Sequence, residues 1–272
     1  MTDFEFDADT AIVPTGDGGY RAQVTERWNI GEVPNGGYVM AIAVRALLES
    51  TGRPDPLSIT GHFVRPAEPG PAEVRVDVVR AGRSASTAVV SLSQGGSERL
   101  RVLGSATDLD LFDGAEVEHG PPPPDLPPPE DCLHTDGVLP GGNVAAVARR
   151  FDLRISPRDA GWARGAPTGR PETAGWVRLA DGRPPDALLM PVVVDGFPPT
   201  VFELGVAGWV PTLELTVHLR RRPEPGWLRC AVTASHVSRG LVTEASAVWD
   251  AHGRLVAVAR QLALLPAPDT ER

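Results

Sequence analysis

The stretch LSITGHFVRPAEPG, residues 57–70, returns later in the chain as LELTVHLRRRPEPG, residues 213–226. Seven of the 14 aligned positions are identical, and every pair is 156 residues apart. Two further pairs, Ile59/Leu215 and Phe63/Leu219, keep apolar side chains at the alternating positions of a half-buried strand. The same spacing holds as far as Val102/Val258. The sequence therefore predicts a tandem duplication.

A repeat of this length is a whole structural unit, so we expect two copies packed about an approximate twofold axis. Their sheets should join side by side into one antiparallel sheet, because the open edge of each sheet needs a partner. The 272 residues suit two units, residues 1–110 and 144–272. Residues 111–143 are the predicted linker, since PPPP and PPP at 121–129 favour extended polyproline structure.

The first copy has the pattern of a strand, a buried helix and an antiparallel meander. In PNGGYVMAIAVRALLEST, Asn35 can cap a helix whose first turn holds Gly36 and Gly37. The helix is apolar almost all round, which indicates that other structure surrounds it. Four strand-like segments follow, at 57–65, 72–81, 84–94 and 98–108. This order is typical of a hotdog unit, an α+β arrangement in which a curved sheet wraps a helix.

The second copy repeats these strands at 213–222, 227–236, 241–249 and 254–264. PPDALLMPVVVDGF stands where the first copy has its helix, and Pro191 within it predicts a short or kinked helix.

Composition limits the classes of function. The formal charge of −9 and pI near 5.2 argue against nucleic acid as a partner. Cys132 and Cys230 are too few and too far apart for a disulfide or metal framework, so we expect no cofactor. An acidic N-terminus without a leader pattern, and the lack of a long apolar run, predict a cytoplasmic protein without membrane insertion. Homo-oligomerisation stays open.

Four motifs resemble one family in the expected order: NGGY at 35–38, HFVRP at 62–66, ELTVHLRR at 214–221 and WDAHGRLVAVARQ at 249–261. The chain looks like the thioesterase-like superfamily of acyl-CoA thioesterases, which have a double hotdog fold and include the bacterial thioesterase II enzymes. The resemblance covers nearly the whole chain. It implies an acyl-CoA substrate that is hydrolysed to a free acid and CoA.

The resemblance also implies a site on the second copy. In better-known members an aspartate, a threonine or serine and a glutamine on successive strands hold a water. The aspartate position falls on Glu214, which is a departure from the family, and the glutamine position falls on Gln261. The hydroxyl corresponds to either Thr233 or Ser235, depending on the direction of counting.

These residue types suit thioester hydrolysis. A carboxylate such as Glu214 can activate water, while a hydroxyl and an amide position it and the carbonyl. Unpaired N–H groups of the first helical turn suit a developing oxyanion. Arginines suit CoA phosphates. The candidates for substrate binding are Asn35, Gly36, Gly37, His62, Arg65 and Arg221.

Each candidate also has a structural interpretation. Glu214 could pair with a neighbouring arginine, and Thr233 and Ser235 suit any strand. His62 has an equivalent in His218, which favours a packing role shared by both copies.

The offset of 156 predicts that one copy alone carries the chemistry. It places Ser58 opposite Glu214, Ser105 opposite Gln261, Asp77 opposite Thr233 and Val79 opposite Ser235. The first copy thus lacks the base and the amide.

Two other functions compete with hydrolysis. A hotdog dehydratase or hydratase would need an aspartate and histidine pair near the helix start, where no D-x-x-x-x-H segment occurs. A non-catalytic acyl-CoA or lipid-binding protein would bind acyl-CoA without releasing CoA.

Overall fold

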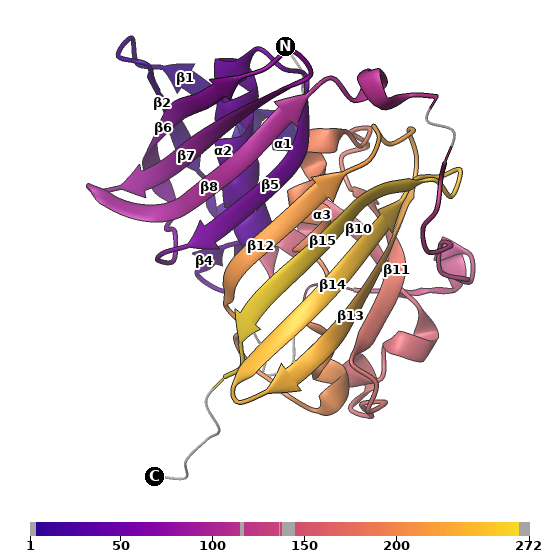
Figure 1. Ribbon diagram of the computed structural model, residues 1–272. Helices are drawn as coiled ribbons and strands as arrows, with labels where there is room; N and C mark the ends of the chain where they lie inside the picture. The colour runs from indigo at the N-terminus through magenta and orange to yellow at the C-terminus, as the bar shows by residue number, and fades with distance from the viewer. Residues whose placement is uncertain (1–3, 115–116, 136, 138–144, 267–272) are drawn as a thin grey trace, which may run out of the picture.

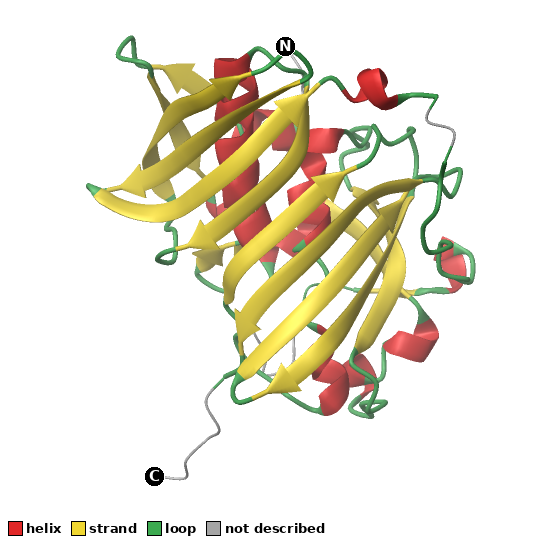
Figure 2. Ribbon diagram, viewed as in Figure 1, coloured by secondary structure: helices red, strands yellow, loops and turns green. Residues whose placement is uncertain are grey.

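The computed structural model describes residues 4–114, 117–135, 137 and 145–266. Within these ranges thirteen strands form one antiparallel sheet in the order β1-β2-β6-β7-β8-β5-β12-β15-β14-β13-β11-β10-β9 (Figure 1). The long helix Gly36–Thr51 lies behind this sheet in the view of Figure 2. The fold is the expected α+β double hotdog, with both units in one continuous sheet.

The first unit contains α1 (Glu5–Asp9), β1 (Ile12–Pro14), β2 (Gly19–Val24), the hairpin β3 (Asn29–Ile30) and β4 (Val33–Pro34), α2 (Gly36–Thr51), β5 (Asp55–Phe63), β6 (Gly70–Ala81), β7 (Ala85–Gln94) and β8 (Ser97–Thr107). The second contains β9 (Leu133–His134), β10 (Phe151–Ile155), β11 (Glu172–Leu179), α3 (Met190–Val194), β12 (Thr212–Leu219), β13 (Leu228–Ser238), β14 (Leu241–Trp249) and β15 (Leu255–Leu264). Short 3₁₀ helices lie between these elements, among them η7 (Ala187–Leu189) and η8 (Thr200–Leu204).

The two units meet where β5 pairs with β12. Thr60 lies opposite Thr216 in this pair, and their hydroxyl oxygens are 3.0 Å apart. These residues are equivalent in the duplication, so the pseudo-twofold axis passes between them. Outward from this pair, the strands of the two units correspond one to one. β5, β8, β7, β6, β2 and β1 of the first unit match β12, β15, β14, β13, β11 and β10 of the second.

The offset of 156 fails on the last strand of each unit. Thr60 lies opposite Leu103 on β8, whereas Thr216 lies opposite Arg260 on β15. Leu103 and Arg260 are therefore equivalent and are separated by 157 residues, because the hairpin before β15 is one residue longer than the hairpin before β8. The predicted equivalence of Ser105 with Gln261 is wrong. Gly104 is the equivalent of Gln261.

The linker follows the second unit closely. The indole of Trp176 donates a hydrogen bond of 2.8 Å to the carbonyl of Pro127, and the indole of Trp249 donates one of 3.2 Å to Pro121. β9, within the predicted linker, pairs with β10 at one edge of the sheet. Parts of the linker, residues 115–116, 136 and 138–144, lie outside the described residues.

The two helices pack against each other where their glycine and proline residues meet. Asn35 caps α2 by accepting a hydrogen bond from the Tyr38 amide at 2.9 Å. A Cβ atom on Gly37 would overlap the carbonyl oxygen of Pro191 on α3. Pro191 lies in the first turn of α3, where its missing N–H is tolerated, and α3 has only five residues. α3 is therefore short, as expected, with Pro191 at its start.

We predict that Gly37→Ala destabilises the protein. Alanine in place of glycine ordinarily stabilises a helix by about 0.5–1 kcal/mol. Here the added methyl group must push α3 away, at a cost of about 1–3 kcal/mol. Urea denaturation should show a lower midpoint for Gly37→Ala, while Glu49→Ala on the exposed face of α2 should not lower it. A stabilised Gly37→Ala variant would contradict this packing.

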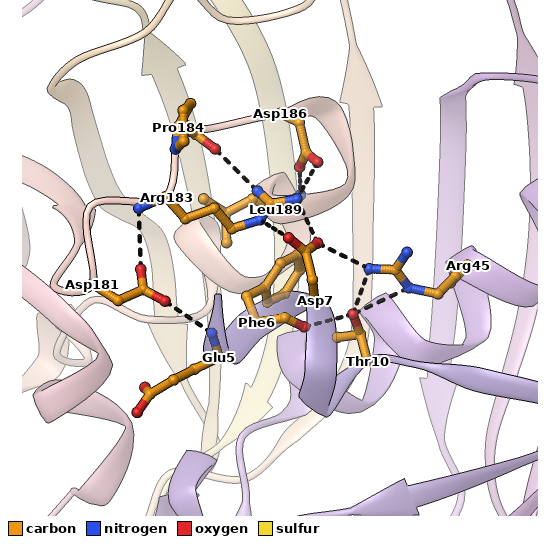
Figure 3. Close-up of polar contacts among 10 residues, drawn as sticks. All are labelled: Glu5, Phe6, Asp7, Thr10, Arg45, Asp181, Arg183, Pro184, Asp186 and Leu189. Atoms are coloured by element: carbon orange, nitrogen blue, oxygen red, sulfur yellow. Dashed lines mark hydrogen bonds and ion pairs between the residues drawn. The ribbon is translucent and has the colours of Figure 1, made fainter. Parts of the chain in front are cut away.

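A cluster of charged residues fastens α1 to the second unit (Figure 3). Arg183, whose side chain is 9% exposed, donates hydrogen bonds to Asp7 at 2.9 Å and to Asp186 at 2.5 Å. Its guanidinium also lies over the ring of Phe6, 4.9 Å from the centroid. Asp186 in turn accepts a hydrogen bond from the Leu189 amide and so caps the turn that leads into α3. Burial alone would raise the pKa of Asp7, but Arg183 and Arg45 together lower it.

We predict that Arg183→Leu destabilises the protein by about 3 kcal/mol, because it leaves a partly buried carboxylate without its main partner. Arg101→Leu removes an exposed ion pair with Glu98 and should change stability by less than about 1 kcal/mol. Denaturation midpoints at pH 7 compare the two variants. Since the folded-state pKa of Asp7 is lowered, the contribution of Arg183 is present above about pH 4 and fades as the pH falls below that value. Equal losses for both variants would contradict the role of Arg183.

Candidate active site

A cavity of about 330 Å³ lies at the junction of the two units. The start of α2 and the residues after β5 contribute from the first unit, and β13, β14, β15 and the segment between α3 and β12 contribute from the second. Its wall is mostly apolar, and the partly exposed side chains of Val64 and Trp209 line it near the surface. Such a lining with few polar groups suits an acyl chain.

Asp195, directly after α3, is one of two carboxylates that the described residues contribute to this cavity. Its Oδ2 accepts hydrogen bonds from the Gly37 amide and from Asn35 Nδ2, both at 2.8 Å. The side chain of Thr212 also favours the ionised form of this carboxyl group. Burial raises the pKa of Asp195 to about 6, against the effect of these donors, and the nearby Glu244 acts in the same direction as burial. Such a carboxyl group can exchange a proton close to neutral pH.

Gln261 on β15 reaches Asp195 through a hydroxyl. Its Nε2 donates a hydrogen bond of 2.8 Å to Thr212 Oγ1, and the Thr212 side chain in turn lowers the pKa of Asp195. Thr212 enters the cavity because Leu213 forms a β-bulge, so that Thr212 lies opposite the buried Ala263. Asn35, Asp195, Thr212 and Gln261 thus form one polar row along the cavity wall.

Glu244 on β14 is a second carboxylate in the same wall. It is 6% exposed and lies directly opposite Gln261 in the β14–β15 pair. Burial raises the pKa of Glu244.

Several residues expected in the site line the cavity: Asn35, Gly36, Arg65 and Gln261. Gly37 lies behind them, with its amide bonded to Asp195. The expected array of first-turn amides is therefore partly occupied. Among the described residues no acceptor takes a hydrogen bond from the Gly36 amide, which leaves that N–H group for a ligand.

The structure does not bring Glu214 into the cavity. Glu214 lies opposite Leu262 and His62 on the outer face of the sheet, and it accepts a hydrogen bond from the Thr216 hydroxyl. The physical reason is strand alternation: Leu215 and Val217 are buried, so their neighbours face outward. Leu215, opposite Gln261, occupies the inward position that a carboxylate of this strand would need.

The remaining candidates also lie outside the cavity. Thr233 follows the buried Val232 and is exposed, while Ser235 is the bulged residue of β13 and donates a hydrogen bond to the Thr243 carbonyl. His62 is exposed on the outer face. Arg221 contacts the carbonyl of Leu255 and the carboxylate of Glu118. The predicted set of Glu214, Thr233 or Ser235, and Gln261 is therefore not assembled, and only Gln261 of this set lines the cavity.

The corresponding positions in the first unit are apolar. Register places Gly104 at the position of Gln261, Ala88 at that of Glu244 and Pro56 at that of Thr212. A Cβ atom on Gly104 would lie 2.5 Å from Leu47 of α2, so the longer helix fills this space. The polar row is built on the second unit alone.

Sequence reasoning missed Asp195, Thr212 and Glu244. Asp195 ends the apolar run MPVVV, and a single acidic residue after five buried ones was a usable signal. Glu244 stands at an inward position of β14 between Val242 and Ser246, which alternation could have shown. Nothing in the sequence marks the bulge that turns Thr212 inward.

The fold and the junction cavity define a double hotdog protein with a largely apolar cavity between its two units. A model of the acyl-CoA thioesterase N-terminal domain matches residues 24–107, and a model of the C-terminal domain matches residues 119–265. The chain belongs to this acyl-CoA thioesterase family.

The chain is also similar to several known proteins. A crystal structure described as a candidate thioesterase II from Thermobifida fusca is 35% identical, with a TM-score of 0.88 over 98% of this chain and 100% of that one. A hot dog fold protein from Alicyclobacillus acidocaldarius is 23% identical, with a TM-score of 0.87 over the same shares. An uncharacterised Mycobacterium tuberculosis protein is 28% identical over 265 residues, or 91% of each chain. Within the described ranges, no helix has the length and hydropathy of a membrane-spanning segment.

Proposed function

We propose that the protein hydrolyses acyl-CoA thioesters to a free acid and CoA, with Asp195 as the general base. The observation that carries the proposal is the Asp195 carboxylate, held at the start of α2 and facing an otherwise largely apolar cavity. Both halves of the chain match acyl-CoA thioesterase domains, which supports hydrolysis of an acyl-CoA thioester as the reaction.

The reaction proceeds in two steps. Asp195 takes a proton from a water molecule while the water oxygen attacks the thioester carbonyl carbon. The Gly36 N–H group and the Gln261 amide donate hydrogen bonds to the oxygen that gains negative charge. The carbon–sulfur bond then breaks, the electron pair leaves with sulfur, and the proton held by Asp195 passes to the CoA thiolate. No covalent intermediate is needed.

The composition of the cavity also bears on the rival functions. None of the described residues that line it is a histidine, so the aspartate–histidine pair of a dehydratase is not assembled there. A binding protein would accept acyl-CoA without turnover. Release of free thiol from a panel of acyl-CoA esters, detected with a chromogenic disulfide, separates hydrolysis from binding.

We predict that Asp195→Asn lowers kcat at least about 100-fold, because general base catalysis supplies about that much. Removal of a buried ionised group should not lower the denaturation midpoint at pH 8, and calorimetric titration should still detect acyl-CoA binding. Glu214→Gln serves as the matched control, since Glu214 lies on the outer face, and its kcat should stay near that of the wild type. The reverse result, with Glu214→Gln inactive and Asp195→Asn active, would identify Glu214 instead of Asp195 as the general base.

We also predict a dependence of kcat/KM on pH that follows Asp195. The base must be ionised, so kcat/KM should fall as the pH drops below about 6. Thr212→Val removes a hydroxyl group that lowers the pKa of Asp195, and the acidic limb of the profile should move to higher pH. Thr216→Val, on the same strand but facing outward, should leave the limb in place. An unchanged limb in Thr212→Val would rule out Thr212 as a positioning residue for Asp195.

A further inference from the structure

Glu244 has no part in the hydrolysis described above, yet it is a buried carboxylate in the cavity wall. Both the amide and the hydroxyl of Thr200 donate hydrogen bonds to its Oε1, at 2.9 Å and 2.5 Å. No described residue donates a hydrogen bond to Oε2, and this oxygen is not among the fully enclosed atoms that lack a partner. Oε2 therefore presents a hydrogen-bond acceptor to the cavity.

The duplication shows that the fold does not require a carboxylate here. The equivalent position on β7 is Ala88, which is fully buried against the core. Burial of a carboxylate is costly unless a partner compensates it. The bonds from Thr200 compensate one oxygen, and a ligand donor can compensate the other.

Register places Glu244 relative to the proposed reaction centre. Gln261 and Glu244 lie opposite each other on adjacent strands. Their backbones are therefore about 4.8 Å apart along the hydrogen-bonding direction. Gln261 contacts Thr212 on its other side, toward Asp195. Glu244 thus lies about one strand spacing beyond the group that would orient the thioester carbonyl. A donor on the third carbon of an acyl chain is the nearest substituent that spans this distance.

We propose that Glu244 selects acyl groups with a hydroxyl on the third carbon, whose O–H donates to Glu244 Oε2. The proposal rests on the hydrolysis assigned to this cavity. A hydroxyl is favoured over an ammonium group, because a charged group loses far more hydration when it enters an apolar cavity. A plain acyl chain would leave Oε2 dehydrated and unpaired, and this discriminates against it.

The experiment compares butanoyl-CoA with 3-hydroxybutanoyl-CoA, which differ only in that hydroxyl. For the wild type we expect kcat/KM to favour the hydroxy ester about tenfold, as a buried polar group left without a hydrogen-bond partner by the plain ester implies. Glu244→Ala copies Ala88 of the first unit and should bring the ratio of the two values close to one. Glu244→Gln keeps an acceptor for Thr200, so this variant should fold even if Glu244→Ala does not. Its ratio of the two kcat/KM values should also fall. Glu214→Ala, on the outer face, should keep the wild-type ratio.

A wild-type ratio near one, or an equal loss on both esters in the Glu244 variants, would overturn the selectivity. Absence of CoA release from either ester would instead contradict the proposed hydrolysis. In that case the dissociation constants of the two esters, measured by calorimetry, would test Glu244 in the same way. Formation of an unsaturated acyl-CoA, detected by its ultraviolet absorbance, would show that the enzyme dehydrates its substrate and would contradict the proposed hydrolysis. The role of Glu244 would then be tested by the same comparison of the affinities for the two esters.

Discussion

The pairing of β5 with β12 is the constraint on which the rest of the structure depends. Each unit alone would present an open strand edge, and the hydrogen bonds around Thr60 and Thr216 close both edges at once. The same pairing brings the start of α2 beside the end of α3, where Asn35 and Gly37 reach Asp195 across a separation of about 160 residues in sequence. The candidate site is therefore a product of the junction, because neither unit alone holds both the amides and the carboxylate.

Divergence of the two copies then decides where the cavity lies. In the first unit, α2 is 16 residues long and its Leu47 packs close to Gly104. In the second unit, α3 has five residues, and the chain continues as GFPPT into η8. A helix that stops early leaves room over β14 and β15, where Gln261 and Glu244 face inward. The equivalent places in the first unit hold glycine and alanine beneath a full-length helix.

The duplication, the continuous sheet and the buried helix could all be predicted from the sequence, because each depends on residue types at regular spacing. Glu214 shows where a motif misleads. Its place in ELTVHLRR suggested a base, whereas simple alternation with the buried Leu215 already pointed it outward. Two irregularities lay beyond sequence reasoning. A bulge at Leu213 turns Thr212 inward, and one extra residue in the last hairpin shifts Gln261 to the inward position of Gly104.

For the carboxylates of the cavity, the protonation state that stabilises the fold differs from the state that a general base needs. Burial raises the pKa of both Asp195 and Glu244, so the folded chain holds their protons more tightly than the unfolded chain does. For Asp195 the associated stability is fully present below the ordinary value of 3.8 and is lost as the pH rises through about 6. A general base acts only when it is ionised, so the state that can hydrolyse a thioester is the less stable one. Ala88, the equivalent of Glu244 in the first unit, shows how the same fold avoids this conflict where no chemistry is required.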